Sequence, residues 1–164
     1  MGKLIVIIAT IFLLNCSLLG KKSLENVSGA TTVSVEKVVE LMGIYTEKDG
    51  KKVRKTLFID TRKSKDLKNG GTIPGAVHLN IKKQEEFNQV RILTHPKFTG
   101  DILVFCNGHS CLRAQNAALK LVSWKAKGLD GGGIKSIYYF RDGFPSYRDH
   151  IFDDGSKNPI IMPY

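Results

Sequence analysis

The sequence predicts an α/β fold, in which three layers are built around a central, mostly parallel sheet of about five strands. Short apolar runs at Thr56–Asp60, 101–105 and Ile134–Phe140 are typical of strands that are buried on both faces. Segments with helical periodicity precede or follow these runs, and such alternation favours parallel pairing. A chain of 164 residues with 42% hydrophobic residues has the length and composition of one globular domain.

The charge of the chain is strongly basic, with a formal net charge of +10 and a pI of about 9.6. A basic protein is attracted to nucleic acids, anionic membranes or small anions. The lysines are scattered and form no basic stripe interleaved with aromatic residues. We therefore expect no nucleic-acid partner, and small anions or a membrane surface explain the charge.

The first fifteen residues, 1–15, have the pattern of an export signal. Lys3 precedes an apolar run at 4–14, which is too short to span a bilayer but suits the core of such a signal. The run ends in Leu-Leu-Asn-Cys, which resembles the lipobox of bacterial lipoproteins, where the cysteine is acylated and becomes the first mature residue. The resemblance implies lipidation of Cys16 and a membrane-anchored protein that faces the periplasm or the cell exterior. A plain signal peptide and an uncleaved anchor stay open as alternatives.

The segment before the first helix is polar and has no periodicity, so residues 16–32 are predicted to be a tether. A domain is predicted over 33–150. Ser34 is a candidate cap for a helix, since apolar residues follow it at helical spacing. These apolar residues are Val35, Val38, Val39 and Met42. A turn is expected at 49–50, where Asp is followed by Gly.

The middle of the domain begins with the strand Thr56–Asp60. A loop or short helix is expected over 63–71, because this stretch is polar and contains glycine. The Ile-Pro-Gly-Ala sequence at 73–76 predicts a turn, and a short strand is expected at 77–80. A helix is predicted over 84–93.

The second half of the domain follows the strand at 101–105. A loop is expected over 106–113 and a helix over 114–127, which a glycine at 128 ends. The core side of this helix is predicted to hold Ala117, Ala118, Leu121, Val122 and Trp124. After the strand Ile134–Phe140, a turn is expected at 142–145. Residues 151–164 are predicted to be a C-terminal tail, with irregular structure from Asp153.

Two strand ends carry candidate chemistry, because sites in open parallel sheets lie beyond the carboxyl ends of the strands. One strand end delivers Asp60 and Arg62, and the other delivers Cys106. The N–H groups and the dipole of a following helix favour a thiolate at Cys106, and Arg113 adds a positive charge. The alternative is a buried, inert cysteine, but Gly108, Arg113 and the following helix favour a reactive one.

Four segments resemble motifs of the single-domain rhodanese-like sulfurtransferases, in the order of that family. The Phe-Ile-Asp-Thr-Arg of 58–62 resembles the strand that ends in Asp-x-Arg, and 71–78 resembles the Gly-His-Ile-Pro-Gly-Ala segment, with Thr in place of the usual His. Residues 102–106 resemble the strand that carries the catalytic cysteine, and 138–144 resemble the last strand and its Gly-Gly-Phe turn. The resemblance covers roughly 33–148 and implies a rhodanese-like fold.

The loop departs from the family pattern. Six residues separate Cys106 from Arg113, whereas the family usually has four and the related cysteine phosphatases have five, which disfavours a phosphatase. Ala114 stands where Ser or Thr is usual. A second cysteine, Cys111, lies inside the loop, and the Cys-Asn-Gly-x-x-Cys-x-Arg arrangement resembles a smaller rhodanese-like subset.

The resemblance implies sulfur transfer through a persulfide on Cys106, from a small anionic donor such as thiosulfate to a thiol or cyanide acceptor. Arg113 and Asp60 are implied as further catalytic residues, with Asp60 more suited to pairing with an arginine than to acting as a base. Loop N–H groups and Arg113 hold the anionic leaving group. The candidate substrate-binding residues are Asn107, Gly108, His109, Ser110, Cys111, Leu112 and Arg62.

No cofactor and no metal is predicted, because the spacing of Cys106, His109 and Cys111 matches no zinc pattern. Two other functions stay open: a thiol–disulfide protein in which Cys106 attacks and Cys111 resolves, and a non-catalytic binding module. In an exported protein, a nearby cysteine can trap an oxidised thiol reversibly. We therefore predict a Cys106–Cys111 disulfide in the oxidised protein. The donor, the acceptor and the oligomeric state are left open.

Overall fold

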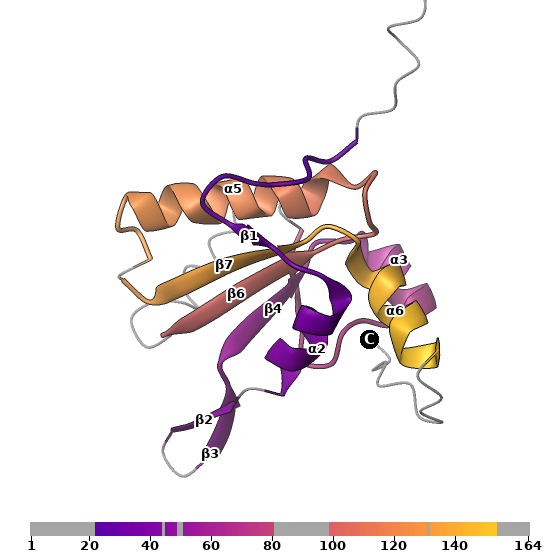
Figure 1. Ribbon diagram of the computed structural model, residues 1–164, viewed down its shortest axis with the longest axis horizontal. Helices are drawn as coiled ribbons and strands as arrows, with labels where there is room; N and C mark the ends of the chain where they lie inside the picture. The colour runs from indigo at the N-terminus through magenta and orange to yellow at the C-terminus, as the bar shows by residue number, and fades with distance from the viewer. Residues whose placement is uncertain (1–21, 44, 49–50, 81–98, 131, 154–164) are drawn as a thin grey trace, which may run out of the picture.

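The structure is a computed structural model, and it describes residues 22–43, 45–48, 51–80, 99–130 and 132–153 (Figure 1). Its centre is a five-stranded sheet with the order β1-β7-β6-β4-β5, in which every pairing is parallel. The strands are β1 (Thr31–Thr32), β4 (Thr56–Asp60), β5 (Val77–His78), β6 (Gly100–Phe105) and β7 (Ile134–Phe140). The predicted sheet is confirmed, and the short strand expected at 77–80 is two residues long.

Helices cover both faces of this sheet (Figure 1). Helix α5 (Leu112–Ala126) lies on one face, and α2 (Val35–Met42), α3 (Ser64–Gly70) and α6 (Gly143–Asp153) lie on the other. Two separate apolar clusters fill the space between the layers, one including Leu121 of α5 and the other including Tyr147 of α6. Two cores on opposite faces of one sheet confirm the predicted three-layer architecture.

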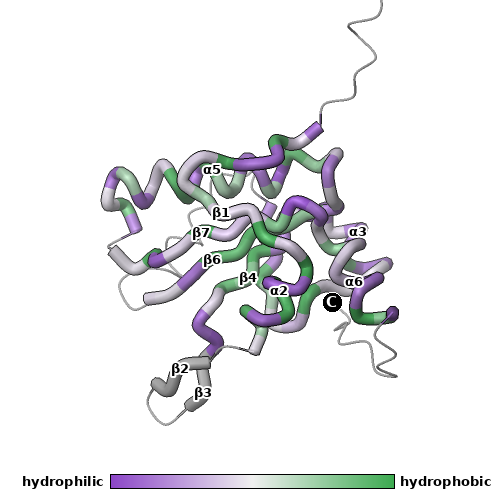
Figure 2. The backbone as a smooth tube through the Cα atoms, viewed as in Figure 1, coloured by the Kyte–Doolittle hydropathy of each residue, from purple (hydrophilic) through white to green (hydrophobic). Residues whose placement is uncertain are grey.

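Strand β6 lies in the middle of the sheet, and all its residues are buried. Figure 2 shows hydrophobic residues gathered along β4 and β6. The register pairs Asp60 of β4 with Phe105 of β6, so the two strands end side by side. Because the strands are parallel, the residues that follow them emerge at the same edge of the sheet, and Cys106 is the next residue after β6.

A small antiparallel hairpin of β2 (Tyr45–Lys48) and β3 (Lys51–Arg54) forms a separate two-stranded sheet. Its strands were not predicted from the sequence. The turn expected at 49–50 and the helix expected at 84–93 lie outside the described residues. Within the residues that are described, no helix is long and apolar enough to cross a membrane.

The N-terminal segment corrects the prediction of a tether over 16–32, as far as residues 22–32 are concerned. Val27 is buried in the cluster beneath α5, and Thr31 and Thr32 pair with Tyr138 and Tyr139 of β7. Threonine has a high strand propensity, but a strand of two residues is too short to show a pattern in the sequence, so this edge strand depends on the partner that β7 provides. The remaining residues of the predicted tether, 16–21, lie outside the described part of the chain.

The C-terminal helix α6 corrects the turn expected at 142–145, and it extends into the predicted tail of 151–164 as far as Asp153. Gly143 begins the helix with a φ of 70°, and Pro145 lies in the first turn, where a missing N–H breaks no helical hydrogen bond. Tyr147 and Ile151 are buried against the sheet, which stabilises the helix beyond its weak start. Residues 154–164 of the predicted tail are outside the described residues.

Candidate active site

The ends of β4 and β6 are joined by Thr61, the residue after β4. Both its backbone N–H and its hydroxyl donate to the Phe105 carbonyl oxygen, at 3.0 and 2.7 Å. These two hydrogen bonds hold the chain after β4 against the chain that enters the cysteine loop, residues 106–111. The candidate site is thus assembled on one edge of the sheet from two strands that are distant in sequence.

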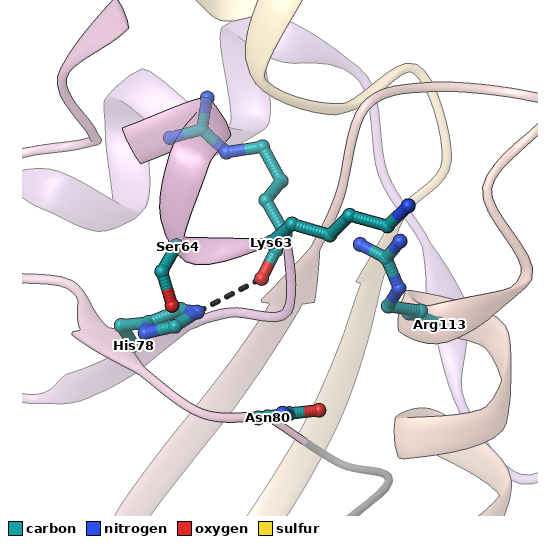
Figure 3. Close-up of a pocket in the computed structure, with 6 residues that line it drawn as sticks. Lys63, Ser64, His78, Asn80 and Arg113 are labelled. Atoms are coloured by element: carbon teal, nitrogen blue, oxygen red, sulfur yellow. Dashed lines mark hydrogen bonds between the residues drawn. The ribbon is translucent and has the colours of Figure 1, made fainter. Parts of the chain in front are cut away.

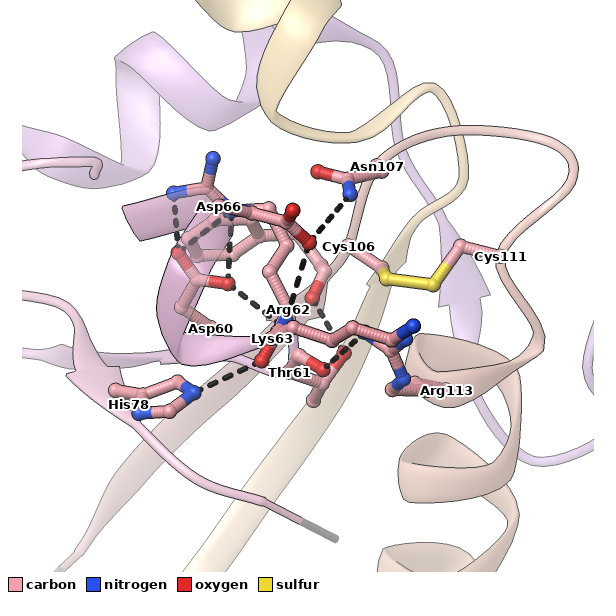
Figure 4. Close-up of a disulfide and its surroundings, with 11 residues drawn as sticks. Asp60, Thr61, Arg62, Lys63, Asp66, His78, Cys106, Asn107, Cys111 and Arg113 are labelled. Carbon is pink, nitrogen blue, oxygen red and sulfur yellow. Dashed lines mark hydrogen bonds and ion pairs between the residues drawn. A yellow bond between two sulfur atoms is a disulfide. The ribbon is translucent and has the colours of Figure 1, made fainter. Parts of the chain in front are cut away.

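The first part of the site is a buried ion pair between Asp60 and Arg62, shown in Figure 4. The guanidinium donates to both carboxylate oxygens at 2.7–3.0 Å, and Thr72 donates its hydroxyl to the same carboxylate at 2.7 Å. Arg62 also donates to the Gly71 carbonyl and lies 3.9 Å above the Phe144 ring. These contacts occupy both side chains, so the geometry gives the pair a positioning role rather than that of an acid or base.

The second part of the site is a disulfide between Cys106 and Cys111 (Figure 4). Their Cα atoms are 6.1 Å apart, which is within the usual range for disulfides. The predicted bridge is therefore present. Cys106 is only 1% exposed, whereas Cys111 is half-buried, so the outer face of the disulfide belongs to Cys111.

The start of α5 differs from the expected start at residue 114. The helix begins at Leu112, and Cys111 is its N-cap residue. Leu112 and Arg113 are good helix formers, and the Cys111 N–H donates to the Gly108 carbonyl at 2.9 Å. The helix N-terminus therefore lies nearer to Cys111 than the predicted start at residue 114 implied, and its N–H groups favour a thiolate there. Cys106 instead lies at the end of the strand.

The cysteine loop is held from two sides. Gly108 has a φ of 96°, a conformation that favours glycine, and this turn brings the chain back toward Cys106. The Phe144 N–H donates to the Cys106 carbonyl at 2.8 Å, and a side chain on Gly143 would collide with that carbonyl. The His109 ring contacts Asp142 at 2.5 Å. The loop is thereby fixed against the start of α6.

Asn107 forms a further link, because its side-chain amide donates to Asp66 at 3.0 Å. Desolvation alone would raise the pKa of Asp66, but the hydrogen bonds from Asn107 and from the Lys63 backbone, with the charge of Lys65, lower this pKa overall. Asp66 therefore carries its negative charge at neutral pH and anchors the loop to α3.

A cavity of about 290 Å³ is rich in positive charge (Figure 3), and neither cysteine is among its lining residues. Figure 4 shows the disulfide near Lys63 and Arg113. Lys63 and Arg113 extend toward each other across the cavity (Figures 3 and 4). Lys63 is the residue before α3, and Arg113 lies in the first turn of α5. Arg113 also donates to the Thr61 carbonyl over a long 3.4 Å. The lining residues are Arg62, Lys63, Ser64, His78, Asn80 and Arg113. Such a cavity suits a small anion.

A family model for the rhodanese-like domain matches residues 44–150 of the chain. The chain belongs to this family. No curated protein matches it.

Solved structures resemble this rhodanese-like domain in fold. A Saccharomyces cerevisiae homologue of single-domain rhodanese and the Cdc25 phosphatase catalytic domain has a TM-score of 0.59 at 16% identity, over 82% of this chain and 90% of that chain. The As-Sb reductase of Leishmania major has a TM-score of 0.57 at 21% identity, over 79% of this chain and 83% of that chain. Identities this low show that the fold is shared, and they say nothing about the reaction.

The predicted substrate-binding residues do not all lie together in this rhodanese-like domain. Arg62 and Arg113 border the cationic cavity, but Gly108 and His109 line a separate, open hollow on the α6 side. Ser110 is exposed, and Leu112 is half-buried as the first residue of α5. No cluster of three or more potential metal ligands occurs among the described residues.

Sequence analysis missed four residues of the cavity: Lys63, Ser64, His78 and Asn80. The signal for Lys63 was available, since it directly follows Asp-x-Arg at a strand end. His78 was visible as the last residue of a strand, and its ring lies 2.8 Å from the Arg62 carbonyl. Asn80 follows the same strand, but nothing in its neighbours indicates that the chain turns it toward Arg113.

Proposed function

We propose that this rhodanese-like domain is a sulfurtransferase that carries a sulfane sulfur on Cys106. The observation that supports this most is the position of Cys106, which is buried at the carboxyl edge of the sheet, in a disulfide that Figure 4 shows near Lys63 and Arg113. A thiolate is stabilised by nearby cations, and an anionic donor is attracted by the same charges.

The proposed reaction begins with the reduced protein. The Cys106 thiolate attacks the outer sulfur of thiosulfate, a bond forms between these two sulfurs, and the bond to the sulfonate sulfur breaks. Sulfite leaves with the electron pair of that bond, and Arg113 and Lys63 stabilise its charge. A thiolate or cyanide acceptor then attacks the outer sulfur of the persulfide, and the Cys106 thiolate is restored.

The intact mass of the purified protein after treatment with thiosulfate tests this proposal. Reduced protein that has been freed of reductant is mixed with a limiting amount of thiosulfate, and sulfite is measured in the same sample. We expect sulfite release that depends on Cys106 and on prior reduction of the disulfide. Reduced protein that releases no sulfite and keeps its mass would refute a sulfurtransferase of this kind.

Thiol–disulfide exchange is the second candidate, and the disulfide itself favours it. The half-buried Cys111 is open to attack by an external thiolate, which would leave Cys106 as the departing thiolate. This function predicts that the protein oxidises a dithiol substrate, or is oxidised by a disulfide substrate, without any gain of sulfur. Sulfite release separates it from sulfur transfer, because thiol–disulfide exchange changes the mass by two hydrogens without cleaving thiosulfate to sulfite.

We also propose that the domain works from a membrane anchor on Cys16, exported from the cytoplasm. The basic charge supports attraction to an anionic membrane surface. Ser23, which follows the predicted anchor in the sequence, lies next to the cysteine loop, because its N–H donates to the His109 carbonyl at 2.8 Å. Detergent-phase partitioning should be lost in Cys16→Ser, and unchanged partitioning of that variant would refute the anchor.

A further inference from the structure

Resting on the proposed function, we propose that Cys111 attacks the Cys106 persulfide and releases the carried sulfur as sulfide. The protein would then have an activity beyond transfer to an external acceptor: a sulfide-releasing cycle that ends in the Cys106–Cys111 disulfide and is reset by a dithiol reductant. Transfer to an external acceptor has no need of Cys111, so the pairing of the two cysteines calls for a separate explanation.

The geometry identifies which sulfur Cys111 attacks. In a persulfide, the inner sulfur is Cys106 Sγ and the outer sulfur is the one that the donor supplied. The structure joins Cys111 Sγ to Cys106 Sγ, with the Cα atoms 6.1 Å apart. Cys111 is therefore placed to reach the inner sulfur, and attack at the inner sulfur expels the outer one.

The protein holds both cysteines in place for this step. The Cys106 carbonyl accepts from the Phe144 N–H at 2.8 Å, and the Cys111 N–H donates to the Gly108 carbonyl at 2.9 Å. The backbone on each side of the reacting sulfurs is thus fixed by hydrogen bonds. A thiol held in position reacts faster than one that must diffuse to the site.

The burial of Cys106 affects attack by Cys111 and attack by an external thiol in different ways. Cys106 is 1% exposed, so an external thiol meets the outer sulfur of a persulfide before the inner one. Cys111 already lies inside the loop, half-buried at the N-cap of α5, where backbone N–H groups favour its thiolate. Lys63 and Arg113 beside the disulfide offset the repulsion between this thiolate and a charged persulfide (Figure 4).

The step balances in atoms and electrons. Cys111 Sγ gives up its proton and forms a bond to Cys106 Sγ, while the bond from Cys106 Sγ to the outer sulfur breaks. The outer sulfur leaves with that electron pair and takes a proton to become hydrosulfide. The two cysteines are oxidised together by two electrons, and the carried sulfur is reduced by two.

The cycle closes through a reductant of the dithiol class. Its first thiolate attacks the more exposed Cys111 Sγ, Cys106 departs as a thiolate, and the second thiol of the reductant resolves the mixed disulfide. The reductant is thereby oxidised to a disulfide. Such a protein consumes a sulfane sulfur donor and a dithiol, and produces sulfide.

A single-turnover experiment with the full chain tests this inference. Reduced protein, freed of reductant by gel filtration, receives thiosulfate, and both sulfide and sulfite are trapped and measured. The variants are Cys111→Ser and a control, Ser123→Ala, which changes an exposed residue of α5 away from the loop. Circular dichroism and peptide mapping accompany each sample, so that a folding defect is recognised.

For wild type and Ser123→Ala we expect one sulfide and one sulfite per chain, with a mass lower by two hydrogens and a Cys106–Cys111 disulfide. For Cys111→Ser we expect sulfite, a gain of one sulfur on Cys106, and loss of the sulfide burst. The inference is overturned if wild type keeps the extra sulfur with Cys111 a free thiol, or if Cys111→Ser releases as much sulfide as wild type. If wild type and Cys111→Ser release no sulfite, the proposed sulfurtransferase itself fails.

If Cys111→Ser does not fold, wild type alone still decides. Peptide mapping of the wild-type reaction at increasing times shows whether the persulfide on Cys106 precedes the disulfide and whether sulfide appears as it disappears. A disulfide that forms without sulfide release would contradict the inference.

Discussion

The two arginines at the carboxyl edge of the sheet have opposite environments. Arg62, at the end of β4, is 3% exposed and is held by the Asp60 carboxylate, the Gly71 carbonyl and the Phe144 ring. Arg113, at the start of α5, is half-buried and reaches the Thr61 carbonyl at 3.4 Å beside the cationic cavity. Arg62 holds the fold together, whereas Arg113 makes one hydrogen bond among the described residues, and its remaining donors can face an anion.

The same difference is found between the ends of β4 and β6, after which the two arginines lie. The end of β4 carries a buried ion pair whose loss leaves an unpaired charge, which is costly for stability. The end of β6 carries the disulfide and the start of α5, where side chains are more exposed and can meet a substrate. We therefore expect changes near β4 to affect mainly stability and changes near β6 to affect mainly activity.

The largest expected effect is on the chemistry of the β6 end. Cys106→Ser should reduce sulfur transfer to background, because the hydroxyl is a far weaker nucleophile and holds no persulfide. Cys111→Ser should keep much of the transfer to an external acceptor, such as cyanide. Thiocyanate formation from thiosulfate measures both variants. Full activity in Cys106→Ser would reverse the assignment in favour of Cys111.

At the β4 end, Asp60→Ala should lower the free energy of unfolding by about 3–5 kcal/mol, because it leaves the Arg62 guanidinium buried without its counter-ion. Denaturant unfolding measures this change. Asp149→Ala is the matched control, since it removes the partner of an exposed arginine, Arg148, and should cost about 0–1 kcal/mol. Equal effects of the two substitutions would contradict the structural role of the Asp60 pair.

Arg113→Ala should lower kcat/KM for thiosulfate by about 10²-fold, the size of effect that follows the loss of one charged donor to a leaving group. Its free energy of unfolding should stay within about 1 kcal/mol of wild type, because the half-buried guanidinium leaves no buried acid unpaired. Arg148→Ala serves as the activity control, as this arginine is exposed on α6. A large loss of stability with unchanged kcat/KM would invert the comparison of the two arginines.

The sequence predicted the parts of the fold that depend on local pattern. The central strands at 56–60, 101–105 and 134–140 are apolar runs, and their periodicity and bounds identify them without knowledge of their partners. The helix at Val35–Met42 was predicted in the same way, from its apolar spacing and the serine before it. The end of each central strand also located Asp60 and Cys106 at one edge.

Other parts of the fold depend on partners that are distant in sequence. Thr31 and Thr32 form a strand because β7 is beside them, and α6 is stabilised by burial of Tyr147 and Ile151, although Gly143 and Pro145 indicate a turn. Sequence patterns carry no information about such contacts.

The candidate site also contains residues that local sequence predicts and residues that only the fold brings together. Cys106, Cys111 and Arg113 were found from residue types and spacing, because these residues lie within one short stretch of the sequence. Asn80 was missed because its side chain joins the cavity only when a separate connection folds over the sheet edge, whereas Lys63 could have been predicted from its place directly after Asp-x-Arg. The start of α5 was predicted two residues too late, and Cys111 was thus not placed at the N-cap position, because a helix start is uncertain by one or two residues from sequence.

The smallest expected effect concerns pH and returns to the β4 end. Tyr147 is buried beside Phe144, whose ring lies against Arg62, and this burial raises the pKa of Tyr147 to about 12. In the unfolded chain the pKa of the phenol is about 10, so the unfolded state loses its proton first as the pH rises. The contribution of Tyr147 to stability is therefore complete below pH 10 and declines as the pH approaches 12. By linkage, the free energy of unfolding should fall by about 1 kcal/mol between roughly pH 10 and 11 through this group.

Denaturant unfolding of wild type and Tyr147→Phe at each pH isolates the effect, since the variant keeps the ring but has no proton to lose. The offset between the two proteins at neutral pH is not informative, because the variant also loses whatever contacts the hydroxyl makes. The difference between their pH slopes is informative: parallel slopes would mean that the phenol ionises as easily in the folded protein as in the unfolded chain, and that the packing around Phe144 and Arg62 admits water.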